Sequence, residues 1–441
     1  MRLSRRDTIK TVGGISTVGI TGLAGCSGNG NGGNGNGGNG GGNGGGNGGG
    51  NGGGNGNGNG GGGGGTTTLG VIMPVSGTIS ELGPPCRDAA DVAIQEINDA
   101  GGLLGGDVEV QHEDSESVPD AGVRAANRLI EGSGVPAMVG PLSSGVGMSI
   151  APIAAESEVT YMPGGSSPEF TELDQTDWVF RTRPSDAFVG AALAQIAYEG
   201  RGMETASSIV VNNDFGIGLA DSFQEAFEEL GGEMIARERA NIGQTSYRSE
   251  LDSLFGEGPD VVLNGCYQDE ATNIFRQWFE QDLGGQWMVH SGLIGSEFLE
   301  GIGEEIADGI FASNPRLPDN EANSYFRGLM EDTDTGDPGE LIFPPNTYDA
   351  INMITLAAER AGEASGQAIR DNLRNIANPD GMDVQTVGDG LEALRNDEEI
   401  RYIGASHNCD LTENGEAKGL SFSEIEVQGT EPESVNTIQL D

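Results

Sequence analysis

From residue 66 onward, short apolar segments alternate with longer segments that have helical periodicity. Residues 69–73 and 108–110 are the first two apolar segments, and residues 87–100 and 120–131 are the helical segments that follow them. A buried strand followed by a helix is the repeating unit of a parallel sheet that is covered on both faces. The alternation therefore predicts an α/β fold built from βαβ units.

The alternation forms two series of similar composition, which meet near Arg183 and Pro184. We expect two doubly wound lobes with a cleft between them, outside the carboxyl ends of the strands. The other strands are expected at residues 137–139, 159–162, 179–180, 208–211, 234–236, 261–263, 287–289 and 310–311, with period-two segments at 420–422 and 425–427. The other helices are expected at residues 144–158, 187–198, 218–230, 246–255, 270–281, 321–330, 347–361 and 368–375.

The N-terminal segment has the pattern of a targeting signal. Residues 4–10 carry Arg5 and Arg6, and residues 11–24 are uncharged and moderately hydrophobic. That stretch is too short for a membrane-spanning helix, which needs ~20 residues. With the following Gly25 and Cys26, residues 1–25 resemble a twin-arginine signal ending in a lipobox, in which Cys26 becomes the lipidated first residue. The alternative is a stray cysteine after a hydrophobic stretch.

Residues 28–65 consist of Gly and Asn alone. Such a segment buries no apolar surface, and a Gly-rich coil of this length has an end-to-end distance of roughly 35 Å. We therefore interpret residues 26–65 as a lipidated cysteine followed by a flexible tether that holds the folded part away from a surface.

The formal net charge of the 441-residue chain is −46, and Lys418 is the only lysine after Lys10. A body this acidic repels nucleic acid and anionic membranes, so nonspecific polyanion binding is excluded by sign. At molar salt the screening length falls to about 3 Å, which removes the self-repulsion. The composition favours a salt-adapted protein over a merely acidic one.

Catalytic and cofactor motifs are absent from the sequence. It contains no phosphate-binding GxxxxGK[ST] loop and no GxSxG in a strand-to-helix context. His112, His290 and His407 lack metal-ligand spacing, so we interpret them as structural histidines. Together with scattered cysteines, this predicts no enzyme activity, no cofactor and no metal.

Two strand-to-helix turns are rich in small residues and hydroxyls. Residues 140–144 end in Ser143 and Ser144, and residues 164–169 contain Ser166 and Glu169 at the spacing of a capping box, with Pro168 suited to the first turn. The unpaired N–H groups of a helix N-terminus favour an anionic group such as a carboxylate. The alternative is that these serines merely cap their own helices.

Several segments resemble the type I periplasmic binding proteins of the branched-chain amino acid and amide group, which serve ABC importers. They are residues 70–77, 93–105, 213–218 and 263–267, together with the two serine turns, and the resemblance spans nearly all of residues 66–441 in order. It implies lobe 1 from residues 66–184 and 314–420, lobe 2 from residues 185–313 and 421–441, and a multi-strand hinge between them. It also implies a monomeric, lipid-anchored protein outside the cell that delivers a small ligand to an ABC permease.

The family pattern also implies a ligand site. Ser144 falls on the hydroxyl that binds the ligand carboxylate, and Gly164, Gly165 and Ser166 fall on the contacts beside it. The second lobe contributes two aromatic residues at the family's positions, Phe215 and Tyr267.

Two departures affect the expected ligand. Leu82 replaces an aromatic residue of the leucine-binding relatives, and Gly292 stands where those relatives carry the acidic partner of the ligand ammonium. Asp269 or Glu270 would have to supply that charge. A branched-chain or related amino acid is the first expectation, and an amide, a urea-like compound or a small carboxylate is the alternative. A ligand-sensing receptor domain shares the same fold.

Cys86, Cys266 and Cys409 follow the lipobox cysteine. Because three is an odd number, at least one of them stays unpaired or pairs between molecules, and the sequence does not specify which.

Overall fold

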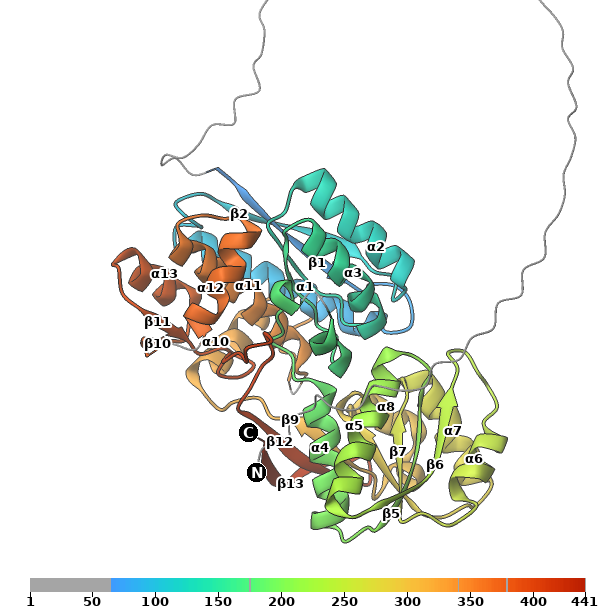
Figure 1. Ribbon diagram of the computed structural model, residues 1–441. Helices are drawn as coiled ribbons and strands as arrows, with labels where there is room; N and C mark the ends of the chain where they lie inside the picture. Colours follow the sequence, from blue (N-terminus) through green and yellow to red (C-terminus); the bar gives the residue numbers. More distant parts are fainter. Residues whose placement is uncertain (1–64, 174–175, 340, 378–379, 441) are drawn as a thin grey trace, which may run out of the picture. The chain divides into compact units, whose positions relative to one another are not determined.

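The computed structural model describes residues 65–173, 176–339, 341–377 and 380–440 (Figure 1). The predicted signal, Cys26 and the tether lie outside the described residues. No described helix is both long enough and apolar enough to span a bilayer.

The first sheet contains four parallel strands in the order β2-β1-β3-β4. The strands are β1 (Thr67–Met73), β2 (Val108–Asp114), β3 (Ala137–Val139) and β4 (Thr160–Met162). Helices α1 (Gly83–Asp99), α2 (Pro119–Asn127) and α3 (Ser144–Glu156) follow the first three strands. The ends of these strands and helices lie within about four residues of their predicted positions, because the period of the apolar residues is a local property.

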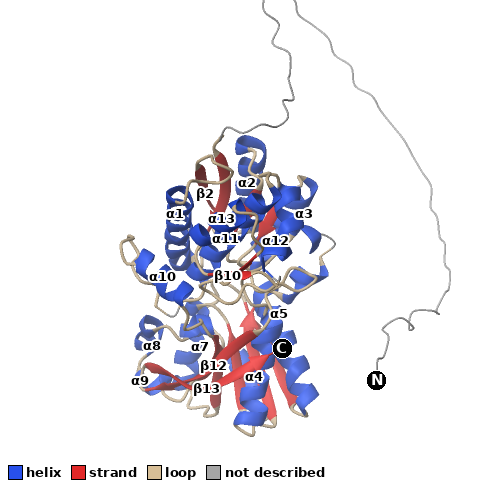
Figure 2. Ribbon diagram, turned by 90° about the vertical axis from the view of Figure 1, so that its left-hand side faces the viewer, coloured by secondary structure: helices blue, strands red, loops and turns tan. Residues whose placement is uncertain are grey.

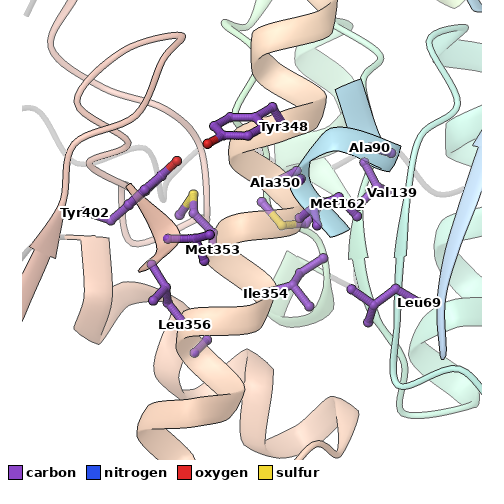
Figure 3. Close-up of a cluster of buried hydrophobic side chains, with 14 of the residues drawn as sticks. Leu69, Ala90, Val139, Met162, Tyr348, Ala350, Met353, Ile354, Leu356 and Tyr402 are labelled. Atoms are coloured by element: carbon purple, nitrogen blue, oxygen red, sulfur yellow. The ribbon is translucent and has the colours of Figure 1, made fainter. Parts of the chain in front are cut away.

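Helices from far along the chain complete this first lobe. They are α10 (Glu321–Met330), α11 (Phe343–Ala361), α12 (Gly366–Ala377) and α13 (Val387–Arg395), with a small parallel pair of strands, β10 (Met382–Val384) and β11 (Ile400–Tyr402). Figure 3 shows Ala350 and Ile354 of α11 in one buried cluster with Leu69 of β1 and Val139 of β3. Residues from the start and from the end of the described chain therefore pack into a common hydrophobic core in the first lobe.

The second sheet contains seven strands in the order β13-β12-β9-β8-β7-β5-β6. Its parallel part is β5 (Thr205–Val211), β6 (Glu233–Ala240), β7 (Val261–Gly265), β8 (Gln286–His290) and β9 (Phe311–Pro315). The hairpin of β12 (Leu420–Gln428) and β13 (Glu431–Leu440) joins it antiparallel to β9. The second lobe's helices are α4 (Asp186–Gln195), α5 (Asp214–Leu230), α6 (Arg248–Phe255), α7 (Gln268–Glu280), α8 (Ser296–Ile302) and α9 (Glu304–Ala307). Figure 2 shows α4, α5, α7, α8 and α9 beside the strands of this lobe.

The chain passes between the two lobes near residues 181–185, between β9 and α10, and again just before β12. Both lobes belong to one compact unit. The α/β class with two doubly wound lobes is confirmed by this topology.

Some details differ from the sequence expectations. Residues 179–180 form only an isolated bridge from Val179 to Tyr161 instead of a strand. Strand β13 was not expected, because most of its residues are polar and exposed, as befits an edge strand. Helices α8, α9 and α13 and strands β10 and β11 were missed as well, since each is short.

Candidate ligand-binding site

A cavity of about 640 Å³, part of it open to solvent, lies between the two lobes. We call its first side the first-lobe wall, formed by Ile79, Glu81, Leu82, Leu142, Ser144, Ser166, Arg183 and Phe343. We call its other side the second-lobe wall, formed by Phe215, Tyr267, Gln268, His290, Ser291 and Gly292.

Ser144 is the first residue of α3 and is buried. Its hydroxyl oxygen accepts hydrogen bonds from the backbone N–H groups of Ser166 (3.2 Å) and Ser167 (3.1 Å). The side chain therefore connects the two serine turns in addition to lining the cavity. The sequence predicted that Ser144 either binds the ligand or caps its own helix, and it did not predict these hydrogen bonds between the two turns.

Ser166 does not cap the helix that follows it. The cap of the 3-10 helix Pro168–Glu172 is Ser167, whose hydroxyl oxygen accepts from the backbone N–H of Glu169 at 3.3 Å. The Ser166 hydroxyl instead donates to Asp186 at 2.9 Å. The capping box predicted for Ser166 and Glu169 is therefore wrong by one residue, because spacing alone did not distinguish two adjacent serines.

A buried charged network stands behind the first-lobe wall. Asp186 is buried, and the burial raises its carboxyl pKa to about 6, against the opposing effect of the nearby Arg183 charge. Arg181 is 1 % exposed; its guanidinium donates to the carbonyls of Gly165 (3.3 Å) and Ser167 (2.8 Å) and pairs with Glu416. The turn that carries Ser166 is therefore held in place from behind.

Arg183 lies two residues after Arg181 and faces a different environment. Its side chain lines the cavity, and its guanidinium lies 4.3 Å from the centre of the Phe343 ring. Although the residue is only 8 % exposed, its Nη1 atom has no hydrogen-bond partner. Burial lowers the Arg183 pKa to about 10, so the group stays charged at neutral pH.

The second-lobe wall is aromatic. Phe215, near the start of α5, stacks on Tyr267 at 5.7 Å between ring centres and packs edge-on against His290 at 5.1 Å. The Tyr267 hydroxyl accepts from the amide nitrogen of Asn213 at 2.9 Å. Phe215 and Tyr267 follow the ends of β5 and β7, which are neighbours in the sheet, so the fold brings these two distant residues together.

His290 contributes a neutral ring to the second-lobe wall. Its Nε2 lies 2.9 Å from the carbonyl oxygen of Cys266, and its Nδ1 accepts from the N–H of Gly292 at 3.1 Å. This pairing requires the proton on Nε2. Burial lowers the pKa of the ring to about 4, so His290 is uncharged at neutral pH.

The remaining predicted site residues lie outside the cavity lining. Gly164 borders a smaller cavity behind Leu142. Gly165 is a packing position, because a Cβ there would come within 2.8 Å of the Ser144 Cα. Asp269 is exposed on α7, and Glu270 is buried, where one of its carboxylate oxygens accepts from the N–H of Gly243 at 2.9 Å. The structure therefore does not bring Asp269 together with Ser144 and Ser166.

Sequence reasoning missed Arg183, Glu81 and Phe343 as lining residues. Arg183 stands where the two series of strands and helices meet, in a chain poor in basic residues. Its position at this junction is the sequence feature that could have identified it as a site residue. Phe343 had none, because it reaches the cavity from a helix that follows the second lobe in sequence.

Cys86, Cys266 and Cys409 are buried free thiols, which answers the pairing question for the described residues. Among those residues no group of His, Cys, Asp and Glu side chains has the arrangement of a metal site.

The lobes touch beside the cavity. Gly218 of α5 lies so close to the first lobe that a Cβ there would be 2.8 Å from Pro168, and a Cβ at Gly145 would be 2.9 Å from the Asp214 carboxylate. Small residues at both positions allow this approach.

Two α/β lobes around a cavity are the architecture of one large group of binding proteins, and the family model for periplasmic binding proteins matches residues 66–393. The chain belongs to the periplasmic binding protein family. Proteins of this family bind small-molecule ligands and work with ABC permeases.

Individual relatives agree with this assignment. The binding protein is 27% identical over 303 residues to Leu/Ile/Val-binding protein homolog 1 of Brucella abortus, covering 68% of this chain and 80% of that one. It is 24% identical to BasB, a substrate-binding protein of a chemotactic signal transduction system in Halobacterium salinarum, over 78% of this chain and 83% of that one. Its fold is similar to the leucine-binding protein LivK of Thermotoga maritima, with a TM-score of 0.70, 25% identity, and coverage of 84% of this chain and 98% of that one.

Proposed function

We propose that this periplasmic binding protein captures a small organic molecule, with a carboxylate on an apolar body, and delivers it to an ABC importer. The cavity between the lobes carries the proposal, because hydroxyl and guanidinium groups line one wall and aromatic rings line the other. The ligand contacts both walls, so its binding stabilises the closed arrangement of the lobes that the permease would recognise.

Leucine, isoleucine and valine are the first candidates, because several relatives carry Leu/Ile/Val-binding names. Plain carboxylates with a similar carbon skeleton are the second candidates. They are favoured by the absence of an acidic side chain at Gly292, which lines the cavity.

A thermal-shift screen at high salt tests the proposal with branched-chain amino acids, other amino acids, amides and small carboxylates. We expect at least one compound to raise the thermal midpoint in a concentration-dependent way, since binding only to the native state stabilises it by mass action. A screen in which none of these compounds shifts the midpoint would contradict the proposed ligand class.

Delivery to a signal transducer instead of a permease is a second candidate, which the similarity to BasB favours. Deleting the gene distinguishes the two. Loss of ligand uptake supports the importer, whereas normal uptake with lost chemotaxis toward the ligand supports the transducer.

We also propose that a lipid on Cys26 anchors the protein outside the cell and that residues 28–65 form its tether. The sequence around Cys26 supports this, with two arginines and an uncharged stretch before the cysteine and a segment of Gly and Asn alone after it. Cys26→Ser should release the protein into the medium, as measured by cell fractionation. An unchanged membrane-bound fraction would refute the anchor.

The net charge of −46 further supports a proposal that the protein is adapted to high salt. Dilution to ~0.01 M salt extends the screening length to about 30 Å, so like charges repel across the whole molecule. The thermal midpoint should fall steadily from molar to millimolar salt. A midpoint independent of salt would refute the adaptation.

A further inference from the structure

Arg183 is the buried cation of the cavity and lacks a matched anion. Among the described residues it forms no ion pair within 4.0 Å, and its Nη1 atom has no hydrogen-bond partner. The Asp186 carboxylate, the nearby charge that favours its protonated form, is engaged by the Ser166 hydroxyl. A planar guanidinium with free donors suits a carboxylate, which it can bind through two parallel hydrogen bonds.

The contrast with Arg181 supports this interpretation. Arg181 is buried as well, yet its guanidinium has two carbonyl partners and the Glu416 carboxylate. Buried charges in proteins are normally paired in this way. Both arginines lie in residues 181–185, where the chain first passes between the lobes. The one that lines the cavity is the one with a donor, Nη1, that has no partner.

The cavity offers little to a ligand ammonium group. The residues of the second-lobe wall are uncharged, since both ring nitrogens of His290 are engaged by backbone groups. Asp269 and Glu270 do not line the cavity. Glu81 is the one carboxylate among the lining residues; it belongs to the solvent-exposed part of the first-lobe wall, and its pKa is raised, first by burial and then by the charge of Asp269.

Apolar surface dominates the rest of the lining. Ile79, Leu82 and Leu142 line the first lobe, and the parallel rings of Phe215 and Tyr267, inclined by 7°, line the second. A branched aliphatic chain or a flat aromatic ring fits such surroundings, whereas a second charged group would be desolvated without a partner.

Resting on the proposed function, we infer that Arg183 anchors the ligand carboxylate and that the site selects an apolar monocarboxylate that has no α-ammonium group. Three features define this class of ligand. Arg183 is buried, the walls are apolar, and the second-lobe wall carries no acidic residue.

Calorimetric titration of the full chain at high salt tests the inference. 4-Methylpentanoate, leucine and 4-methylpentanamide share one carbon skeleton and differ at the polar end, and benzoate supplies a flat aromatic body. We expect 4-methylpentanoate or benzoate to bind at least about tenfold more tightly than leucine and the amide, because the amide lacks the charge that pairs with Arg183 and leucine brings an unpaired ammonium.

Substitutions of Arg183 then test whether this residue causes the preference for the acid over the amide. Arg183→Gln should weaken binding of the preferred acid about 10- to 100-fold while leaving the affinity for the amide within about twofold. Arg183→Lys should keep the preference for the acid at reduced affinity, since it retains the charge without the planar fork. Arg370→Gln is the matched control, because Arg370 also lies over an aromatic ring, 4.4 Å from the centre of Trp178, but outside the cavity.

Each outcome bears on the inference. If wild-type protein binds leucine at least as tightly as the acids, the inference is overturned but the proposed function stands, and a loss of leucine binding in Glu81→Gln would identify the ammonium partner. If a folded Arg183→Gln protein binds the acid as well as wild type, Arg183 is not the anchor. If wild-type protein binds none of the four probes, both the inference and the proposed ligand class fail. The comparison of acid with leucine in wild-type protein decides the ligand class even where an Arg183 variant does not fold.

Discussion

The first-lobe wall of the cavity holds its polar groups through hydrogen bonds to its own lobe, to residues 181–185 between the lobes and to Asp186 at the start of α4. The second-lobe wall instead presents aromatic rings that pack on one another. Ser144, Ser166 and the buried Arg181 belong to one connected network. Phe215 and Tyr267 make a single stacked pair, supported by one hydrogen bond from Asn213.

From this difference we infer that the first-lobe wall binds the charged end of the ligand and that the second-lobe wall covers its apolar body. A polar group held by several partners loses little freedom when it binds a ligand, so the first-lobe wall is preorganised for the charged end. Aromatic surface is less demanding in direction and suits closure over an apolar body. Substitutions in the first-lobe network should therefore affect folding, and those in the second-lobe wall should affect affinity.

The largest effect is expected at Arg181. Arg181→Met leaves Glu416 without its partner and the Gly165 carbonyl without a donor, and breaking a buried pair costs about 3–5 kcal/mol. We expect the free energy of unfolding to fall by about 3 kcal/mol in denaturant titrations. Arg401→Met is the control, because its ion pair with Asp410 is partly exposed and should contribute less than about 1 kcal/mol. Equal losses in the two variants would contradict the proposed role of the network.

A smaller loss is expected at Ser144. Ser144→Ala leaves the buried N–H groups of Ser166 and Ser167 without an acceptor, and an unsatisfied buried donor costs about 1–3 kcal/mol. Unfolding in denaturant should show a loss of about 2 kcal/mol. Ser149→Ala, in the same helix, removes only a hydroxyl that donates to the Gly145 carbonyl at 2.9 Å, and should change stability by less than about 1 kcal/mol. If Ser144→Ala were as stable as wild type, the hydrogen bonds of Ser144 would not stabilise the first-lobe wall, and the proposed difference between the walls would be wrong.

On the second-lobe wall the effect should appear in affinity. Tyr267→Leu removes the stacked ring, and an aromatic contact is worth about 0.5–1.5 kcal/mol beyond its buried area, so affinity should fall about 2- to 12-fold. Calorimetry with the compound found by screening measures this. Tyr198→Leu is the control, since Tyr198 packs against Phe227 in the second-lobe core and should change stability without affecting the ligand. A Tyr267→Leu protein with unchanged affinity would argue against closure by this wall.

The smallest effect concerns pH, because Asp186, behind the first-lobe wall, and His290, in the second-lobe wall, change stability in opposite directions as they titrate. The Asp186 pKa is raised to about 6 by burial, so its contribution to stability is lost as pH rises from about 4 through 6. The His290 pKa is lowered to about 4, so its contribution is lost as pH falls from about 6.5 to 4.

Thermal midpoints between pH 4 and 6.5 separate these contributions. Asp186→Asn should lose more stability than wild type as the solution is acidified, and His290→Gln should lose less. Parallel curves for both variants and wild type would show that neither group is perturbed by its wall.

Much of the architecture could be predicted from the local pattern of residues. Most strands and helices from β1 to α7 repeat apolar residues at a period that the segment displays by itself. Ser144, Phe215 and Tyr267 could be placed at strand ends for the same reason, because residues that follow parallel strands collect at one edge of a sheet. The flat, polar segment of β13 carried no such signal.

Only the tertiary structure decided which of these residues share a cavity and which partners they have. The Ser144 hydroxyl faces two N–H groups more than 20 residues away, and Arg183 meets Phe343 of α11, which is brought to the first lobe after the chain has built most of the second. The periodicity of apolar residues indicates which residues of a segment are buried, but it does not indicate which other segment they contact. Whether a buried guanidinium has a carboxylate partner or faces an open cavity depends on contacts between segments far apart in the chain, and these exist only after folding.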